Sequence, residues 1–156
     1  MKYRQLTKEQ FSEMHHEFAE FLATQQIDKN EWEIMKKENP TLAEEELNLF
    51  SDVVWEKVLA NTTFLEHVSK NHINLFKCDL KEISRIFIQL NDKSRSFLNE
   101  KDYQWFLKHK LDDNIEYFNA SKKYSKERNT EIFELIEMGS HISNGELFNI
   151  ISELIR

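Results

Sequence analysis

The pattern Glu-x-x-His at Glu13 and His16 has the spacing of metal ligands in di-iron helical bundles. Such a centre needs a second copy of the motif, and its ligands must face the interior of the bundle. The sequence has no second copy, and on a helical wheel His16 points almost opposite to the apolar stripe of Phe11, Met14 and Phe18. We therefore expect exposed polar residues at this place, no metal site and no cofactor.

His72 and Cys78 are the other residues whose side chains could carry catalysis. His72 falls within an apolar stripe with Leu65, Val68 and Leu75, which is more typical of a hydrogen-bonded core histidine than of a base or a metal ligand. Cys78 could act as a nucleophile only with a positioned base and a lowered pKa, and a lone cysteine in a Phe-rich region is usually a small core residue. The sequence assigns no catalytic residue.

The segment 117–128 interleaves cations with aromatic side chains. Cations can contact phosphates and aromatic rings can stack on bases, so this segment is a candidate nucleic-acid patch. The residues that would form it are Lys122, Lys123, Tyr124, Lys126 and Arg128. The simpler interpretation is a solvated loop before a helix. In that interpretation the aromatic residues anchor the segment and the cations pair with nearby acids such as Asp112, Asp113 and Glu116.

A third set of residues, Trp55, Leu59 and Trp105, is apolar but lies off the main apolar stripe of its helix. Apolar residues on two faces indicate a helix that packs on both sides or that keeps one side for a partner. We therefore treat these three residues as a candidate protein interface.

Charge and composition limit the classes of function. The chain has 156 residues, 40% hydrophobic, with a formal net charge of -7, which is unlike a general polyanion-binding protein. Two glycines are too few for phosphate-cradling loops. One cysteine allows no intramolecular disulfide, and no apolar run is long enough for a membrane span. With no apolar segment near the N-terminus, these features predict a cytoplasmic protein that does not enter a membrane.

Helix-start signals recur along the chain. Pairs with capping-box spacing are Thr7/Gln10, Asp28/Glu31, Asn99/Asp102 and Ser143/Glu146, and they predict helices from about 8, 29, 100 and 144. Apolar spacing extends the first helix to Thr24 and adds helices at 42–60, after Thr63 and at 127–138. Residues 80–90 fit either a helix or a strand, with a slight preference for helix, and 115–118 fit a short strand.

These elements predict a mainly α fold in a single compact domain, 1–156, with six or seven helices. A small β element within 83–118 is the one departure from an all-α fold that the sequence suggests.

Five stretches of the sequence together carry a resemblance to a known family, namely 6–11, 43–52, 54–56, 124–130 and 145–147. On these stretches the chain resembles, nearly end to end, a family of small uncharacterised bacterial proteins from Bacteroidetes. The resemblance implies a bacterial cytoplasmic protein, and it implies no activity, ligand or functional residue.

Three hypotheses about function follow. The first is a non-enzymatic protein–protein interaction module, with an unidentified protein partner or a second copy of the chain. The alternative is an RNA- or ribosome-associated protein that uses the segment 117–128. The weakest is an enzyme built around His72.

Overall fold

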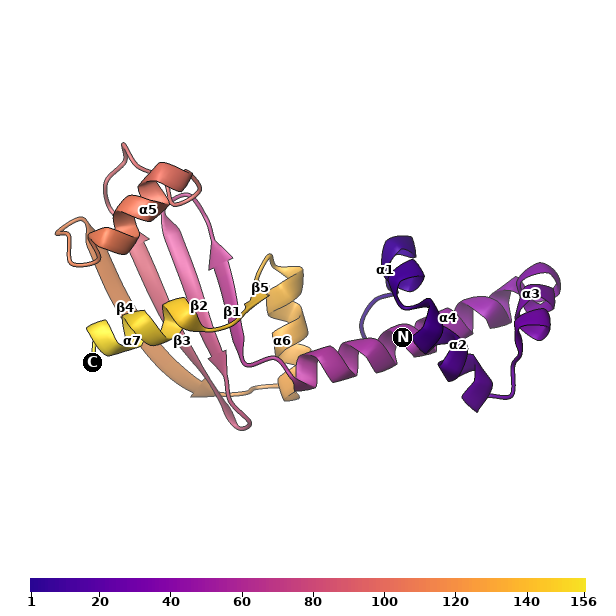
Figure 1. The fold of residues 1–156 in the computed structure, drawn as a ribbon. Helices are drawn as coiled ribbons and strands as arrows, with labels where there is room; N and C mark the ends of the chain where they lie inside the picture. The colour runs from indigo at the N-terminus through magenta and orange to yellow at the C-terminus, as the bar shows by residue number, and fades with distance from the viewer. The chain divides into compact units, whose positions relative to one another are not determined.

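The computed structural model describes all 156 residues, and the chain divides into two compact units, 1–60 and 61–156 (Figure 1). The first unit contains only helices, whereas the second combines three helices with a five-stranded antiparallel sheet. The sequence predicted one domain, and that expectation stays a prediction.

The first unit consists of α1 (Lys8–Glu13), α2 (His15–Thr24), α3 (Lys29–Glu38) and α4 (Pro40–Ala60). Thr7 forms the expected capping box with Gln10, and the Asp28 carboxylate accepts from the N–H of Glu31. The single helix expected up to Thr24 is interrupted at Met14, whose backbone leaves the helical region.

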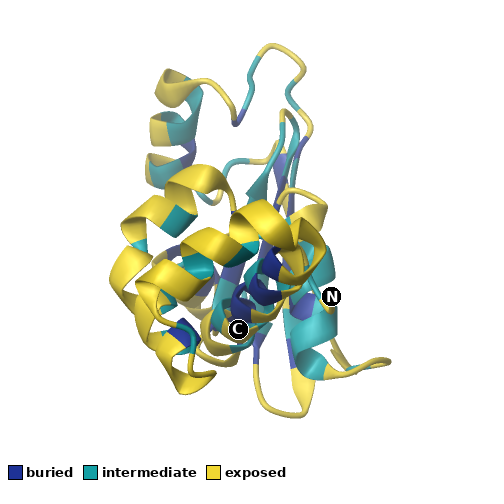
Figure 2. Cartoon of the chain, turned by 90° about the vertical axis from the view of Figure 1, so that its right-hand side faces the viewer, coloured by how far each residue is buried: buried dark blue, intermediate teal, exposed yellow.

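Aromatic side chains hold this helical unit together. The ring of Phe18 lies 5.1 Å from Phe50, 5.2 Å from Trp32 and 5.6 Å from Phe11, measured between centroids. Phe11, Phe18 and Phe21 are only partly buried. Figure 2 shows that these helices are exposed along much of their length, so their core is small.

The second unit follows the order β1 (Phe64–Val68), β2 (His72–Cys78), β3 (Glu82–Leu90), α5 (Glu100–Lys108), β4 (Ile115–Lys123), α6 (Arg128–Glu137), β5 (His141–Ser143) and α7 (Glu146–Leu154). The order of strands in the sheet is β4-β3-β2-β1-β5, and all neighbours are antiparallel. β4 is therefore one edge of the sheet, and the three-residue β5 is the other.

This sheet shows that the mainly α, all-α prediction was wrong, because the fold is α+β. The helix expected after Thr63 is the hairpin of β1 and β2, and the residues 80–90 for which helix was preferred contain the strand β3. The suggested β element within 83–118 exists, but it belongs to a larger sheet. The helix predicted around 100–110 is present as α5.

One face of the sheet carries the core of the second unit. Its side chains come from alternate positions of the strands and meet α5 and α7, with Phe106, Ile73, Leu75, Ile88 and Ile151 fully buried. α6 ends in a Schellman motif, in which the N–H of Ser140 donates to the carbonyl of Leu135 and the N–H of Gly139 donates to the carbonyl of Ile136. Gly139 has φ +114°, a backbone conformation that favours glycine.

Candidate functional site

The opposite face of the sheet carries the polar and aromatic side chains. Strand alternation turns Asn74 and Phe76 of β2 away from the core, together with Arg85 and Phe87 of β3. The register adds Phe118 opposite Phe87 and Lys122 opposite Ile83. We call this surface the outer face, defined by His67, His72, Asn74, Phe76, Arg85, Phe87, Phe118 and Lys122.

A row of rings crosses the outer face. The centroids of His72 and Phe87 lie 5.0 Å apart in a stacked arrangement, and those of Phe87 and Phe118 lie 6.1 Å apart. The guanidinium of Arg85 lies 5.2 Å from the centroid of Phe87, and its Nε donates to Oδ1 of Asn74 at 2.8 Å. Because Phe118 is 49% exposed, the row ends in an accessible ring at the edge strand.

A groove of about 690 Å³ lies between the outer face and α6. The strands contribute Phe76, Arg85 and Lys122 to its walls, and α6 contributes Glu131, Leu135 and Met138. The groove therefore has apolar walls with charges of both signs among them.

Glu131 is the most constrained charged residue of the groove. Its Oε1 accepts from the Ser125 hydroxyl at 2.6 Å, from the Ser125 N–H at 3.1 Å and from Nζ of Lys122 at 3.4 Å. Burial acts to raise the pKa of Glu131, but the hydrogen bonds from Ser125 and Lys122 outweigh it and lower the pKa below its ordinary value. The side chain is only 11% exposed, and Oε2 is buried without a hydrogen-bond partner.

The cations of the candidate nucleic-acid patch do not form one surface. Lys122 pairs with Glu131, and Lys126 pairs with Glu134 at 2.6 Å, so the acids are on α6 rather than the expected Asp112, Asp113 and Glu116. Arg128 donates to the backbone carbonyls of Thr62 at 2.5 Å, Cys78 at 3.0 Å and Asp79 at 3.1 Å. These cations are therefore engaged within the second unit.

Two aromatic residues of the same segment anchor it, as the simpler interpretation expected. The hydroxyl of Tyr117 donates to the carbonyl of Lys110 at 2.6 Å, and that of Tyr124 donates to the carbonyl of Asp79 at 2.8 Å. Burial raises the pKa of each tyrosine to about 12. Phe118 is the exception, because it stays exposed on the outer face.

The three residues of the candidate interface lie in two different settings. Trp55 and Leu59 are buried, and within the first unit the guanidinium of Arg4 lies 5.1 Å from the Trp55 ring. Trp105 is partly buried on α5. The structure gives no common surface for them within either unit.

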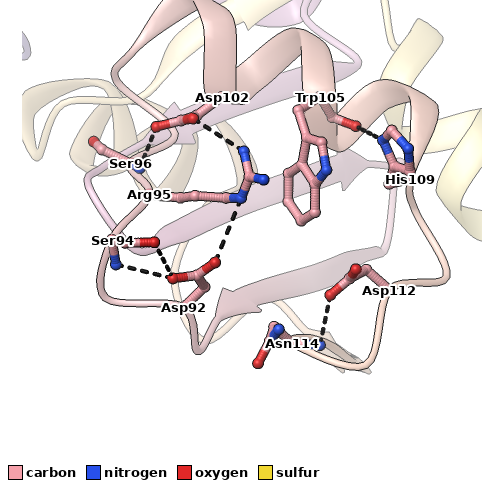
Figure 3. A network of polar contacts seen from close by, with 9 residues as sticks. All are labelled: Asp92, Ser94, Arg95, Ser96, Asp102, Trp105, His109, Asp112 and Asn114. Atoms are coloured by element: carbon pink, nitrogen blue, oxygen red, sulfur yellow. Dashed lines mark hydrogen bonds and ion pairs between the residues drawn. The ribbon is translucent and has the colours of Figure 1, made fainter.

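Figure 3 shows what covers Trp105. The guanidinium of Arg95 lies 3.9 Å from the centroid of the Trp105 ring, and His109 stacks on the ring at 5.4 Å. Arg95 is itself held by Asp92 at 3.4 Å and by Asp102 at 3.3 Å. The indole is thus part of a polar cluster that joins α5 and its C-cap residue to the loop before the helix.

The residues considered for catalysis lie apart from one another. Cys78 is buried, and burial raises the pKa of its thiol to about 11. His72 lies on the outer face and not in the core, where the helical interpretation had put it. No group of three or more His, Cys, Asp or Glu side chains could hold a metal ion, and none of the helices is both long and apolar enough to cross a bilayer.

Sequence reasoning missed His67, Asn74, Arg85 and Phe87. The signal was present in β3, where Ile86, Ile88 and Leu90 alternate with Arg85, Phe87 and Gln89. A strand interpretation of this run puts Arg85 and Phe87 together on the face away from the core.

The fold and the groove define an α+β protein in which one face of an antiparallel sheet is covered by the core helices and the other borders a groove. The chain belongs to a family of unknown function, DUF6495, which it matches over residues 1–156. Searches of curated proteins and of solved structures found no match to the chain.

Proposed function

We propose that the protein is a non-enzymatic protein–protein interaction module, and that its second unit receives a short polypeptide segment in the groove between α6 and the outer face. The observation that carries this proposal is Oε2 of Glu131. A buried carboxylate oxygen without a donor costs free energy, and this cost is recovered if the Glu131 side chain turns toward the groove and accepts from an incoming N–H group. The partner segment therefore carries a basic side chain or a free backbone N–H at this point.

The charges of the groove favour a polypeptide over a polyanion. Glu131 and Glu134 both line the groove, and Lys122 is already paired with Glu131. A phosphate chain entering the groove would meet two carboxylates, with Lys122 already paired and Arg85 bonded to Asn74 and lying over Phe87, whereas a basic polypeptide segment would find complementary charge at Glu131 and Glu134.

The apolar walls of the groove supply an anchor site. Phe76 lies on the sheet side, and Leu135 and Met138 lie on the helix side, with Met138 67% exposed. Methionine is flexible and adapts to the shape of a bound side chain. The partner therefore places an apolar side chain next to its hydrogen-bond donor, as anchor residues of interfaces do.

Affinity capture from native cells tests this proposal. The full chain is used as bait with and without nuclease, and the bound proteins are compared between the wild type and two matched variants. Met138→Glu places a charge in the groove, and Leu98→Glu places the same charge on an equally exposed leucine that does not line the groove. We expect a partner that survives nuclease, is retained by Leu98→Glu and is lost with Met138→Glu.

The contribution of Glu131 is tested in the same assay with Glu131→Gln. The amide keeps an oxygen for Ser125 but replaces the unpartnered acceptor with a donor, so capture should fall while the melting temperature stays near that of the wild type. Equal capture by the wild type, Met138→Glu and Glu131→Gln would contradict the proposal.

The row of rings favours RNA as a second candidate. Phe87 and Phe118 lie exposed or partly exposed on a sheet face, where aromatic side chains of RNA-binding proteins stack on unpaired bases. Fluorescence anisotropy with a labelled single-stranded RNA tests it. Micromolar binding at physiological salt that weakens in Phe118→Ala, and in the triple substitution of Lys122, Lys123 and Lys126 to Ala, would replace the first proposal with this one.

We also propose that the protein works in the bacterial cytoplasm. Its one cysteine is buried as a free thiol, which suits a reducing compartment. Fractionation of native cells with an antibody against the chain tests the location.

A further inference from the structure

We propose that two copies of this chain join edge to edge through β4, in an antiparallel pairing centred on Asn119, to form one continuous sheet. This edge borders the groove that the proposed function uses, because Lys122 lines both, but the pairing of two β4 strands does not depend on any occupant of the groove. The argument starts from the edge strand itself.

β4 presents a long and exposed edge. It has nine residues, it pairs with β3 alone, and every residue from Phe118 to Lys123 is exposed. An exposed edge of this length is a template for another strand, and proteins normally shorten, cover or charge it. β5 at the opposite edge has only three residues, so the two edges of the sheet differ.

The direction of the free backbone groups follows from the β3–β4 ladder. The N–H of Asn91 donates to the carbonyl of Asn114, one step beyond the last paired residues. Because hydrogen-bonded and non-hydrogen-bonded pairs alternate in an antiparallel ladder, the next residue along β4 turns its N–H and carbonyl away from β3. The outward-facing positions are therefore Ile115, Tyr117, Asn119, Ser121 and Lys123, although the N–H of Ile115 already donates to the carbonyl of Asp112.

A two-fold axis at Asn119 makes full use of this edge. Asn119 is the middle residue of Ile115–Lys123, so antiparallel pairing centred there overlaps all nine residues of both copies. The outward-facing Tyr117 then meets the outward-facing Ser121 of the second copy, and the reverse holds across the axis. Such an isologous contact forms a closed dimer, because both β4 edges are paired and neither can accept a third copy.

Side-chain chemistry favours this register over its neighbours. Glu116, Phe118, Ala120 and Lys122 share the outer face. With the axis at Asn119, Glu116 lies opposite Lys122 of the second copy, and Phe118 lies opposite the small Ala120, each twice. Moving the axis to Phe118 sets the two Phe118 rings against each other and leaves Lys122 opposite Asn114, so both charge pairs are lost.

The lysines at the end of the strand also explain why the edge accepts few other strands. Edge lysines oppose non-specific pairing, because an unmatched strand would meet Lys122 and Lys123 without an acid. In the proposed register Glu116 supplies that acid for Lys122, whereas Lys123 lies opposite Ile115; Glu116 is exposed, with Asn91 as its hydrogen-bond donor. The same residues thus reject most strands and match a second copy.

Sedimentation velocity of the full chain over a dilution series tests the proposal. The wild type should show a monomer–dimer equilibrium. Glu116→Lys and Lys122→Glu each place like charges opposite each other at both pairs and should raise the dissociation constant about tenfold or more. The double variant E116K/K122E restores the pairs in reverse and should recover dimerisation, although it also lacks the Lys122–Glu131 contact.

Disulfide trapping reports the register directly. Asn119→Cys would bring two thiols together at the axis, where Cα atoms of a hydrogen-bonded pair lie about 5.5 Å apart, within the range of a disulfide. Oxidation by diamide, which takes up the two thiol hydrogens, should then give a covalent dimer. Ser121→Cys is the matched control, because its two thiols would lie ~13 Å apart along the strands. The native Cys78 is buried and should not react.

A wild type that stays monomeric at the highest concentration reached would overturn the proposal. Dimers that the charge substitutions leave unchanged, or Ser121→Cys crosslinking as fast as Asn119→Cys, would also overturn it, because either result places the contact elsewhere. Binding of an unrelated extended segment to β4, with no self-association, would assign the edge to another protein and reject a second copy.

Discussion

Lys122 and Lys123 are neighbours in the sequence, but their side chains leave β4 on opposite faces of the sheet. Lys122 lies opposite Ile83 on the outer face and reaches Glu131, whereas Lys123 lies opposite Glu82 on the core side. In the sequence, Lys122 and Lys123 look like one continuous basic run in a loop. In the structure they belong to a strand, whose pleat turns their side chains to opposite faces. This division removes the continuous basic strip that a single RNA strand would follow.

Arg128 should stabilise the second unit rather than bind a ligand. Its guanidinium donates to three backbone carbonyls, of Thr62, Cys78 and Asp79, which Arg128→Ala would leave without these donors. We expect a loss of about 1.5–3 kcal/mol in the free energy of unfolding. Urea denaturation measures it, with the exposed Lys123→Ala as a control that should change stability by less than about 0.5 kcal/mol. If Arg128→Ala left the free energy of unfolding unchanged, Arg128 would have no stabilising role, and a role in binding would be the better interpretation.

Phe18 should be the central side chain of the first unit. Its ring touches Phe11, Trp32 and Phe50, but it is only partly buried. We expect Phe18→Ala to cost about 3 kcal/mol, the lower end of the range for Phe truncation in a core.

Unfolding followed by tryptophan fluorescence measures this cost, because Trp32 contacts Phe18 directly. Val53→Ala removes an exposed side chain of α4 and serves as the control, with a change within about 0.5 kcal/mol. Equal effects of the two substitutions would show that the aromatic cluster does not hold the unit together.

Local chemistry predicted the helix starts well. Thr7, Asp28 and Asn99 cap their helices as expected, because a capping hydrogen bond depends only on residues three positions apart. Ser143 fails as a cap because it belongs to β5, where its hydroxyl accepts from the N–H of Gly145. A capping pattern cannot reveal that a residue is already paired with a distant strand.

The β1–β2 and β2–β3 hairpins escaped prediction for a physical reason. Their turns contain neither glycine nor proline, and they close through Ser69 donating to His72 and Asp79 donating to Glu82. Without turn signals, the spacing of Leu65, Val68 and Leu75 fits a helix as well as two strands. The outer face and the groove depend on the whole sheet, so the alternation within β3 is not enough by itself to derive them.

Gly145 should tolerate no side chain. Its φ is +80°, and a Cβ there would lie 2.3 Å from the ring of Phe64, so Gly145→Ala combines backbone strain with a clash. We expect a loss of more than about 1 kcal/mol, with the melting temperature as the measurement. The double variant Gly145→Ala/Phe64→Leu should recover part of the loss. If the losses of the two single substitutions simply add in the double variant, the contact with Phe64 is not the cause of the destabilisation.

Cys78 should make stability fall as the solution becomes alkaline. Burial is the main cause that raises the pKa of its thiol from 9.0 to about 11, with Asp79 acting in the same direction and Arg128 against it. Below pH 9 the thiol is protonated in both the native and the unfolded chain, so its contribution is complete. Between pH 9 and about 11 the unfolded thiol ionises first, and the native state loses up to about 1.4 kcal/mol per pH unit.

Urea denaturation between pH 8 and pH 10 tests this pH dependence of Cys78. The pKa of Tyr117 and of Tyr124 is raised from 10.0 to about 12 in the native state, so these tyrosines add to the slope as the pH nears 10, but they do so in the wild type and in Cys78→Ala alike. The wild type should lose stability across this range, and Cys78→Ala should show a flatter profile at a lower overall stability. The native thiol should also react slowly with Ellman's reagent until urea is added, because it is buried and protonated. Identical slopes for the wild type and Cys78→Ala, with rapid labelling of the native thiol, would place Cys78 in contact with water and contradict its position in the fold.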